Sequence, residues 1–190
     1  MLAKNNIYTY DDYLKFTEED KVEIIDGHIY NMSPAPSRVH QAIISELSYE
    51  LKAYIKSKGG SCKVYPAPFD VVLIKDNENI KNSKDIVQPD ISVICDKSKL
   101  TDKGCTGTPD MIVEVVSPFN PSNDYIRKLS LYEKYGVKEY WIINPMKKNI
   151  LIYNLINTGY DMPNIYSFND TIPVSIFNEL TIDFSTLDLD

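Results

Sequence analysis

Two carboxylates in apolar surroundings are the residues of this sequence best suited to chemistry. Glu114 lies inside residues 111–116 (MIVEVV), a run rich in β-branched residues that is typical of a strand buried on both faces. An ionised carboxylate is rarely buried without a partner, because its desolvation costs too much free energy. Glu114 therefore needs either a bound cation or a basic side chain beside it.

Asp90 is the best partner for Glu114 in a shared metal site. Asp110 lies on the same strand face as Glu114, but four residues at about 3.3 Å each separate the two by roughly 13 Å, so we expect Asp110 to be a loop-end residue. An antiparallel pairing of the PDISVIC and DMIVEVVS strands, closed symmetrically around residues 96–108, instead places Asp90 opposite Glu114. Directly opposed residues have Cβ atoms about 4.5–5.5 Å apart, although a slip of one residue would break this register.

A divalent cation would resolve the electrostatics of this pair. Two opposed carboxylates without a cation repel each other and raise each other's pKa. A hard, oxygen-seeking ion such as Mg²⁺ removes both this repulsion and the cost of burial. The strand pattern alone also allows a structural interpretation, in which Glu114 forms a buried ion pair with a lysine or arginine and Asp90 is a turn or cap residue.

Lys128 is the basic residue that we expect beside these carboxylates. The segment SNDYIRKLSLYEKYG predicts a helix that ends at Gly136, with Asp124 and Lys128 four residues apart on one face. A lysine held over the strand ends can position and acidify an attacking water beside a metal. The alternative is a surface salt bridge worth a few tenths of a kcal/mol. Tyr132 on the same helix is expected to serve packing.

The elements that must position these residues are helices and strands in mixed order. A short helix opened by Thr9 and Asp12 precedes a hairpin at Asp26-Gly27, and an amphipathic helix follows over about 37–58. The strands that we expect after it lie within residues 62–74, 88–95, 110–117, 138–145 and 150–156, followed by a β-rich tail. This order predicts an α/β or α+β fold with a central mixed sheet and helices on its faces.

Composition places the chain among soluble globular proteins. Its 190 residues fit one domain, and neither a signal region nor an apolar run of membrane length is present, so we expect a cytoplasmic protein. Three scattered cysteines imply neither a disulfide framework nor a zinc site, and Cys95 is expected to fill the core. The net charge of −7 argues against nonspecific coating of nucleic acid but does not exclude a nuclease.

These residues together resemble the Uma2 family of restriction-endonuclease-like proteins (the DUF820 type), a branch of the PD-(D/E)xK nuclease superfamily. The resemblance runs from about residue 8 to 155 and is looser in the tail. The segments that carry it, in the family's order and spacing, are VEIIDGHIYNMSP, His40, VQPDISVI, PDMIVEVVSP, NDYIRKLSLYEKYGVKEYWIINP and ILIYNL.

The resemblance implies one restriction-endonuclease-like domain over 1–190, whose central mixed sheet holds a metal at its strand ends. Its parts are an N-terminal helix and hairpin (1–35), a core (36–155) and a β-rich tail (156–190). Asp90 and Glu114 correspond to the two acids of the superfamily motif. Val116 stands where that motif has lysine, and Lys128 fits the branches in which the lysine moves to the neighbouring helix.

Three further positions gain a functional interpretation from the resemblance. Glu23 would approach the metal as an additional ligand or base, where the structural alternative is an exposed strand glutamate. His40 would act as a catalytic group, where the alternative is a core or cap histidine. Gln88 would contact the phosphate or hold a water.

The function implied is hydrolysis of phosphodiester bonds, most simply in DNA, by an endonuclease dependent on Mg²⁺ or Mn²⁺. A homodimer is expected, because cutting both strands commonly uses two active sites, and no membrane is involved. The alternative is a catalytically inactive module of the same fold that binds nucleic acid or protein. A glycosidase with paired carboxylates about 5–10 Å apart ranks last, since no aromatic-lined sugar groove is evident.

Overall fold

A computed structural model describes residues 6–17, 20–32, 36–75, 77–117 and 123–189. Its main sheet is mixed, with the strand order β12-β11-β10-β9-β6-β3 and β13 paired to β11. Strands β9 and β10 are parallel, and the other pairs are antiparallel. The bounds are β3 (Lys63–Pro66), β6 (Ile91–Ile94), β9 (Met111–Val115), β10 (Glu139–Asn144), β11 (Asn149–Ile156), β12 (Gly159–Tyr160) and β13 (Asn164–Ser167). The predicted mixed central sheet is confirmed.

A second sheet has the order β2-β1-β5-β4-β8-β7, and a separate hairpin joins β14 to β15. The predicted N-terminal hairpin is its outer part, and the turn residues Asp26 and Gly27 have φ values of 49° and 77°. The bounds are β1 (Val22–Ile25), β2 (His28–Asn31), β4 (Asp70–Val72), β5 (Ile86–Val87), β7 (Leu100–Thr101), β8 (Gly104–Thr106), β14 (Thr171–Pro173) and β15 (Thr181–Asp183).

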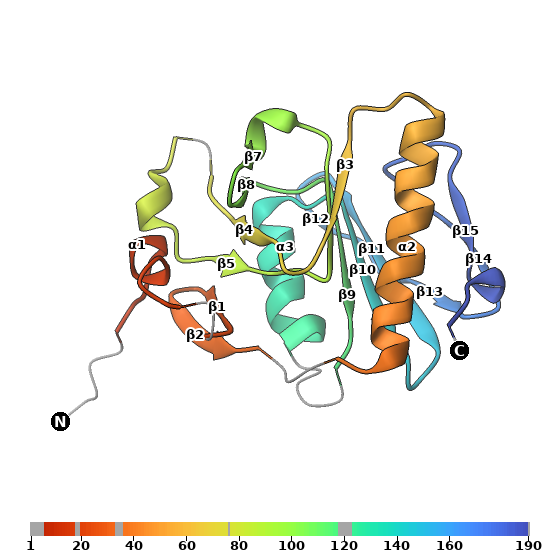
Figure 1. The fold of residues 1–190 in the computed structure, drawn as a ribbon, viewed down its shortest axis with the longest axis horizontal. Helices are drawn as coiled ribbons and strands as arrows, with labels where there is room; N and C mark the ends of the chain where they lie inside the picture. Colours follow the sequence, from red (N-terminus) through yellow and green to blue (C-terminus); the bar gives the residue numbers. More distant parts are fainter. Residues whose placement is uncertain (1–5, 18–19, 33–35, 76, 118–122, 190) are drawn as a thin grey trace.

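Helices α2 (Arg38–Ser57) and α3 (Leu129–Tyr135) lie on opposite sides of the main sheet (Figure 1). The predicted limits of α2 are confirmed, since Ser37 caps its start and Lys58 its end. The opening helix α1 (Tyr10–Tyr13) has the predicted capping box, in which Thr9 N donates to the Asp12 carboxylate at 3.1 Å. Short 3₁₀ turns cover Ile80–Asn82, Lys97–Lys99 and Phe184–Thr186. Among the residues described, no helix is long and apolar enough to cross a membrane.

The segment before α3 differs from the prediction of one continuous α-helix. Residues Asn123–Lys128 form a π-helix that continues directly into α3, and Gly136 ends α3 with a left-handed φ of 77°. Residue Ser122, where the predicted helix began, lies outside the described residues. Rare π segments are found mostly as single turns and often at functional sites. Here the π segment ends on Lys128.

Alternation along β9 and β10 divides their side chains between two cores. One core faces α2 and contains Met111, Val113, Val115, Trp141 and Ile143. The other faces α3 and contains Ile112, Tyr140 and Ile142 together with Leu131 and Tyr132. Because Glu114 is in phase with Ile112, the glutamate points to the α3 side of the sheet.

The predicted register between β6 and β9 is confirmed. Ile91 pairs with Val113, and Val93 pairs with Met111. The same register, continued by one residue, places Asp90 opposite Glu114. Asp110 is a loop-end residue as expected, since its carboxylate accepts from Cys95 N at 2.7 Å and lies 2.6 Å from Lys138.

The expectation that the cysteines form no disulfide is wrong. Cys62 and Cys95 are joined by a disulfide, whereas Cys105 is free and buried. The reason is the pairing of β3 with β6: Lys63 pairs with Ile94, which places the two flanking cysteines opposite each other. The two cysteines are 33 residues apart in the sequence, and cysteine spacing alone does not show that they pair. Cys95 therefore does more than fill space.

The tail covers the α2 side of the main sheet (Figure 1). Its buried side chains belong to the same core as Trp141, and the rings of Trp141 and Phe184 lie 6.3 Å apart. The residues involved are Ile172, Val174, Leu180, Ile182 and Phe184. The apolar and polar alternation of the tail therefore reflects packing onto the sheet.

Gly104 is required by a close approach of two backbones. β8 runs parallel to β4 with Gly104 beside Asp70, and a Cβ at this position would overlap the Asp70 carbonyl oxygen. We expect Gly104→Ala to lower the free energy of unfolding by about 2 kcal/mol or more. Gly59→Ala is the control, since Gly59 also has a positive φ but an open surrounding, and should cost about 1 kcal/mol. Equal losses in urea unfolding would contradict the steric argument.

Candidate active site

Glu114 and Lys128 form a buried ion pair on the α3 side of the main sheet. Lys128 Nζ lies 2.9 Å from Glu114 Oε1 and 3.0 Å from Glu23 Oε1. The exposed fractions are 4% for Glu114, 5% for Glu23 and 5% for Lys128. The interpretation of Lys128 as a surface salt-bridge residue is therefore wrong, and the buried partner required by Glu114 is this lysine.

Tyr132 also contacts Glu114. Its hydroxyl donates to Glu114 Oε1 at 2.8 Å, so this oxygen accepts hydrogen bonds from both Lys128 and Tyr132. Burial, the Glu114 charge and that of Glu23 hold the pKa of Tyr132 well above its usual range. Tyr132 is packed as expected, since its ring meets Tyr140 edge to face. Its hydrogen bond also fixes the position of the Glu114 carboxylate.

Glu23 comes from β1 in the second sheet and bridges the two sheets through Lys128. Its Oε1 also accepts from the backbone N–H of Gln88 at 2.9 Å. The alternative of an exposed strand glutamate is therefore wrong. Strand β1 reaches the site because Ile24 pairs with Ile86 on β5, the strand that leads to Gln88 and Asp90.

Asp90 lies where the ladder between β6 and β9 ends. Its Oδ2 accepts from Val115 N at 2.7 Å and lies 3.4 Å from His40 Nε2. The Asp90 side chain is 18% exposed, so this carboxylate is more accessible than Glu114. The backbone contact to Val115 ties Asp90 to the strand that carries Glu114.

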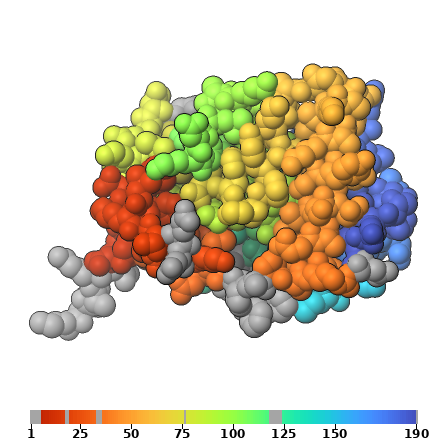
Figure 2. Space-filling model, viewed as in Figure 1, coloured from red at the N-terminus to blue at the C-terminus, as the bar shows by residue number. Residues whose placement is uncertain are grey.

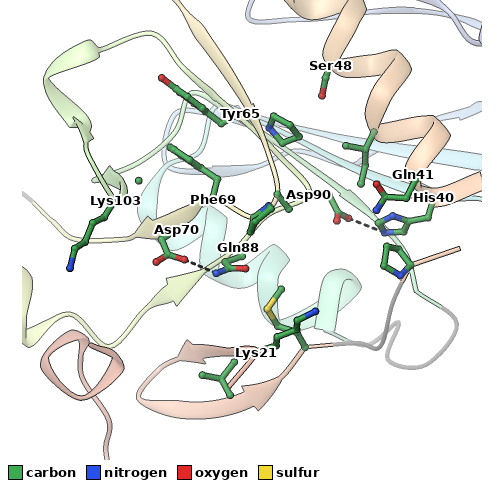
Figure 3. Close-up of a pocket in the computed structure, with 18 of the residues that line it drawn as sticks. Lys21, His40, Gln41, Ser48, Tyr65, Phe69, Asp70, Gln88, Asp90 and Lys103 are labelled. Atoms are coloured by element: carbon green, nitrogen blue, oxygen red, sulfur yellow. Dashed lines mark hydrogen bonds and ion pairs between the residues drawn. The ribbon is translucent and has the colours of Figure 1, made fainter. Parts of the chain in front are cut away.

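His40 reaches Asp90 from the first turn of α2. Burial opposes its protonation, but the hydrogen bond and the charge of Asp90 hold the pKa of His40 above its usual range. His40 Nδ1 is buried and has no hydrogen-bond partner in the described part of the chain. The histidine is thus more than a helix cap, because its ring is aimed at a site carboxylate (Figure 3).

Asp124 is the site residue that the sequence did not identify. It appeared only as the partner of Lys128 in a helical pair, yet it is buried, with Oδ1 4.0 Å from Lys128 Nζ. Burial and the charges of Asp90 and Glu23 raise the pKa of Asp124 to about 6. The charge of Lys128 lowers this pKa, but by a smaller amount. Only the π-helical geometry and the burial of this segment reveal it.

The site holds more negative than positive groups. Three carboxylates, those of Glu23, Glu114 and Asp124, interact with Lys128, and the charge of a fourth, Asp90, acts on Glu114 and Asp124. Burial holds the pKa of Glu114 well above its usual range. The charge of Lys128 lowers this pKa, whereas the charges of the other three carboxylates raise it. Such an excess favours an added cation.

The donor set fits a hard divalent ion held by two carboxylates. No three His, Cys, Asp or Glu side chains are arranged as a metal cluster in residues 6–17, 20–32, 36–75, 77–117 and 123–189. Mg²⁺ commonly binds through one or two carboxylates and keeps several waters. Asp90 and Glu114 are the two carboxylates that would supply such ligands.

Gln88 turns away from this cluster. Its Nε2 donates to Asp70 Oδ1 at 2.6 Å (Figure 3). The same Nε2 lies 3.4 Å from the Tyr13 hydroxyl, which itself donates to Asp70 at 3.0 Å. The backbone N–H of Gln88 donates to Glu23 Oε1, whereas its side chain contacts Asp70 and Tyr13.

A groove of about 1740 Å³ leads to Asp90. It opens where the N-terminal segment, the segment around residues 65–70 and helix α2 meet (Figure 2). His40, Gln88 and Asp90 line it, together with Asp70 and Tyr65 (Figure 3). Among the acidic site residues, Asp90 lines the groove, whereas Glu114 and Lys128 are buried behind its wall and are absent from its lining.

A family model described as "Uma2: Putative restriction endonuclease" matches residues 9–186. The chain belongs to the Uma2 family. The match extends beyond residue 155, where the sequence resemblance became loose, and includes both strands of the tail hairpin. The segment matched by the Uma2 model therefore includes the main sheet, the second sheet and the tail hairpin.

Two further proteins are similar to this Uma2 chain. The uncharacterized protein slr1290 of Synechocystis sp. is 26% identical over 162 residues, which cover 84% of this chain and 74% of the relative. A crystal structure of a putative nuclease belonging to DUF820 from Anabaena variabilis superposes with a TM-score of 0.73 at 22% identity, covering 94% of this chain and 96% of that one. At this identity the superposition shows the shared fold.

Asp124 makes the stability of this Uma2 chain depend on pH. A carboxyl with a pKa near 6 when folded and about 3.9 when unfolded holds more protons in the folded state between these values. Stability therefore falls as pH rises from about 4 to 6, by about 3 kcal/mol for this group. We expect Asp124→Asn to flatten this part of the profile, measured by urea unfolding at pH 4, 5, 6 and 7. If the free energy of unfolding changed with pH in the same way in Asp124→Asn and in the unchanged protein, Asp124 would not be the source of this pH dependence.

Proposed function

We propose that this chain is an endonuclease dependent on Mg²⁺ or Mn²⁺ that hydrolyses phosphodiester bonds in DNA. The observation that carries the proposal is the register of β6 and β9, which continued by one residue places Asp90, in the wall of the groove, opposite Glu114, with Lys128 Nζ 2.9 Å from Glu114 Oε1. The family description supports the nuclease class. The metal, the two ligands and the role of the lysine are part of the proposal.

Asp90 and Glu114 would hold the metal ion. A bound divalent ion polarises a scissile phosphate and lowers the pKa of a bound water. Asp90 is held by Val115 N, and Glu114 is held by Tyr132, so the protein orients both carboxylates before any substrate binds. Such orientation by neighbouring groups is typical of metal sites.

Lys128 would act as a permanent positive charge. Burial opposes its charge, but Glu114, Glu23 and Asp124 hold its pKa well above the usual range. It therefore stays protonated and cannot accept a proton from water at neutral pH. Its role in the proposal is to orient the attacking water and to stabilise negative charge that develops on the phosphate. Glu23 would then be a positioning residue, because it holds Lys128.

Plasmid nicking with Mn²⁺ tests this function. We expect activity in the unchanged protein and its loss in Asp90→Ala, Glu114→Ala and Lys128→Ala. Lys138→Ala is the matched control, because Lys138 has a 66% exposed side chain and pairs with Asp110 away from the groove. Equal residual nicking by all the variants would indicate a contaminating nuclease and would end the proposal.

The competing function is a binding module of the same fold without catalysis. It is favoured by the position of Lys128, whose ammonium already bridges Glu114 and Glu23. Titration calorimetry separates the two functions. Binding of Mn²⁺ that depends on Asp90 supports the nuclease, and no divalent binding supports the inert module.

Two copies would be needed to cut both strands of a duplex at once, so we also propose a homodimer as the active form. Light scattering of the purified chain tests it. A mass of about twice 21.7 kDa is expected in solution. A chain that stays at the monomer mass while it makes double-strand breaks would contradict this arrangement.

A further inference from the structure

The groove beyond Asp90 contains an aromatic and polar pocket that the proposed hydrolysis does not use. Tyr65, at β3, and Phe69, before β4, have their rings stacked with centroids 4.3 Å apart and planes 3° from parallel. Both rings line the groove and are only partly buried (Figure 3). A flat, accessible pair of rings is the surface on which nucleobases stack in proteins that bind single strands.

Polar groups adjoin this stack. Asp70 follows Phe69 directly, and its Oδ1 accepts from both Gln88 and Tyr13. A carboxylate has about four acceptor sites, so Asp70 can accept further hydrogen bonds from the exocyclic amine of a base, as acidic side chains do from cytosine. The Asp70 charge repels phosphate. The part of a nucleotide that fits beside Asp70 is therefore the base.

This pocket is joined to the candidate metal site. The Ala67 N–H, in the loop between the two rings, donates to the Asp90 carbonyl oxygen at 3.0 Å. Gln88 precedes Asp90 by two residues, a span of about 6.6 Å in extended chain, which is within the reach of one nucleotide. A phosphate at Asp90 and a base over Tyr65 and Phe69 can thus belong to the same strand.

From this geometry we infer that Tyr65, Phe69, Asp70 and Gln88 form a subsite for an unpaired nucleobase beside the scissile phosphate. The position of the phosphate in this inference rests on the proposed function. The inference adds the class of DNA that the site would accept. A base inside a duplex cannot stack on these rings, so the substrate is single-stranded DNA, or a strand whose base has left the duplex.

Binding of a fluorescein-labelled 12-nucleotide single strand, measured by anisotropy with Ca²⁺ in place of Mn²⁺, tests the subsite while keeping a divalent cation at the carboxylates. We expect the single strand to bind at least about tenfold more tightly than a duplex of the same sequence, and Tyr65→Leu and Phe69→Leu each to weaken single-strand binding about tenfold. Tyr166→Leu is the control, because Tyr166 is also partly buried but lies on β13. Equal binding of both DNAs, or leucine variants that bind like the unchanged protein, would overturn the inference.

A second measurement needs no variant. A strand carrying 2-aminopurine should lose fluorescence when it binds, because the base stacks on Tyr65 or Phe69, and unchanged fluorescence at every position of the probe would overturn the subsite. Cleavage of the same single strand with Mn²⁺ is scored separately. Cleavage without selective single-strand binding would end this inference alone, and single-strand binding without cleavage of either the strand or the plasmid would end the proposed hydrolysis alone.

Discussion

Lys128→Met is expected to abolish nicking and to lower the free energy of unfolding by about 3–5 kcal/mol, the cost of removing one partner from a buried ion pair. The substitution leaves Glu114 and Glu23, both buried, without their shared cation. Methionine keeps most of the side-chain volume, so the loss reports on charge and not on packing. Urea unfolding at pH 7 and plasmid nicking with Mn²⁺ measure the two effects.

Lys138→Met is the comparison for this effect. Lys138 also lies close to a carboxylate, Asp110 at 2.6 Å, but its side chain is 66% exposed. Exposed pairs contribute about 0–1 kcal/mol, so this variant should stay close to the unchanged protein in both assays. A Lys128→Met protein that is as stable and as active as Lys138→Met would show that the buried pair has neither role.

Asp90→Asn is expected to reduce nicking by at least about 100-fold, since it removes the charge of one proposed metal ligand. The fold should survive, because an asparagine oxygen can still accept from Val115 N, as Asp90 does at 2.7 Å. Circular dichroism and thermal unfolding report the fold, and the rate of plasmid nicking reports the activity.

Asp110→Asn is the matched control, because Asp110 is a carboxylate at the opposite end of the same pair of strands. It accepts from Cys95 N at 2.7 Å, a bond that asparagine can keep, and it lies outside the groove lining. This variant should nick at the unchanged rate. Similar rates for Asp90→Asn and Asp110→Asn would remove Asp90 from the proposed site.

The pairing of Asp90 with Glu114 could be predicted because the two strands flank one loop, and a hairpin closed symmetrically around residues 96–108 has this register. The apolar runs themselves do not specify the register, because both faces of these strands are buried. The same local signals located α2, the hairpin at Asp26-Gly27 and the mixed sheet. Each depends on residues close in sequence.

The parts that could not be predicted depend on contacts between distant segments. The Cys62–Cys95 disulfide follows from the pairing of β3 with β6. Glu23 is buried because β1 joins β5 beside the site. Asp124 is buried because its helical segment is π and lies against the sheet. Glu and Asp are residue types ordinary for a surface or a loop, and cysteine is ordinary for a core, so only tertiary structure gives these residues their roles.

Calorimetric titration of Mn²⁺ into the purified chain tests the central claim most directly. The claim is that Asp90 and Glu114 hold a divalent cation next to Lys128. We predict saturable binding of one ion per chain, retained in Asp110→Asn and lost in Asp90→Asn and Glu114→Gln. No binding by the unchanged protein, or equal binding by all four proteins, would contradict it.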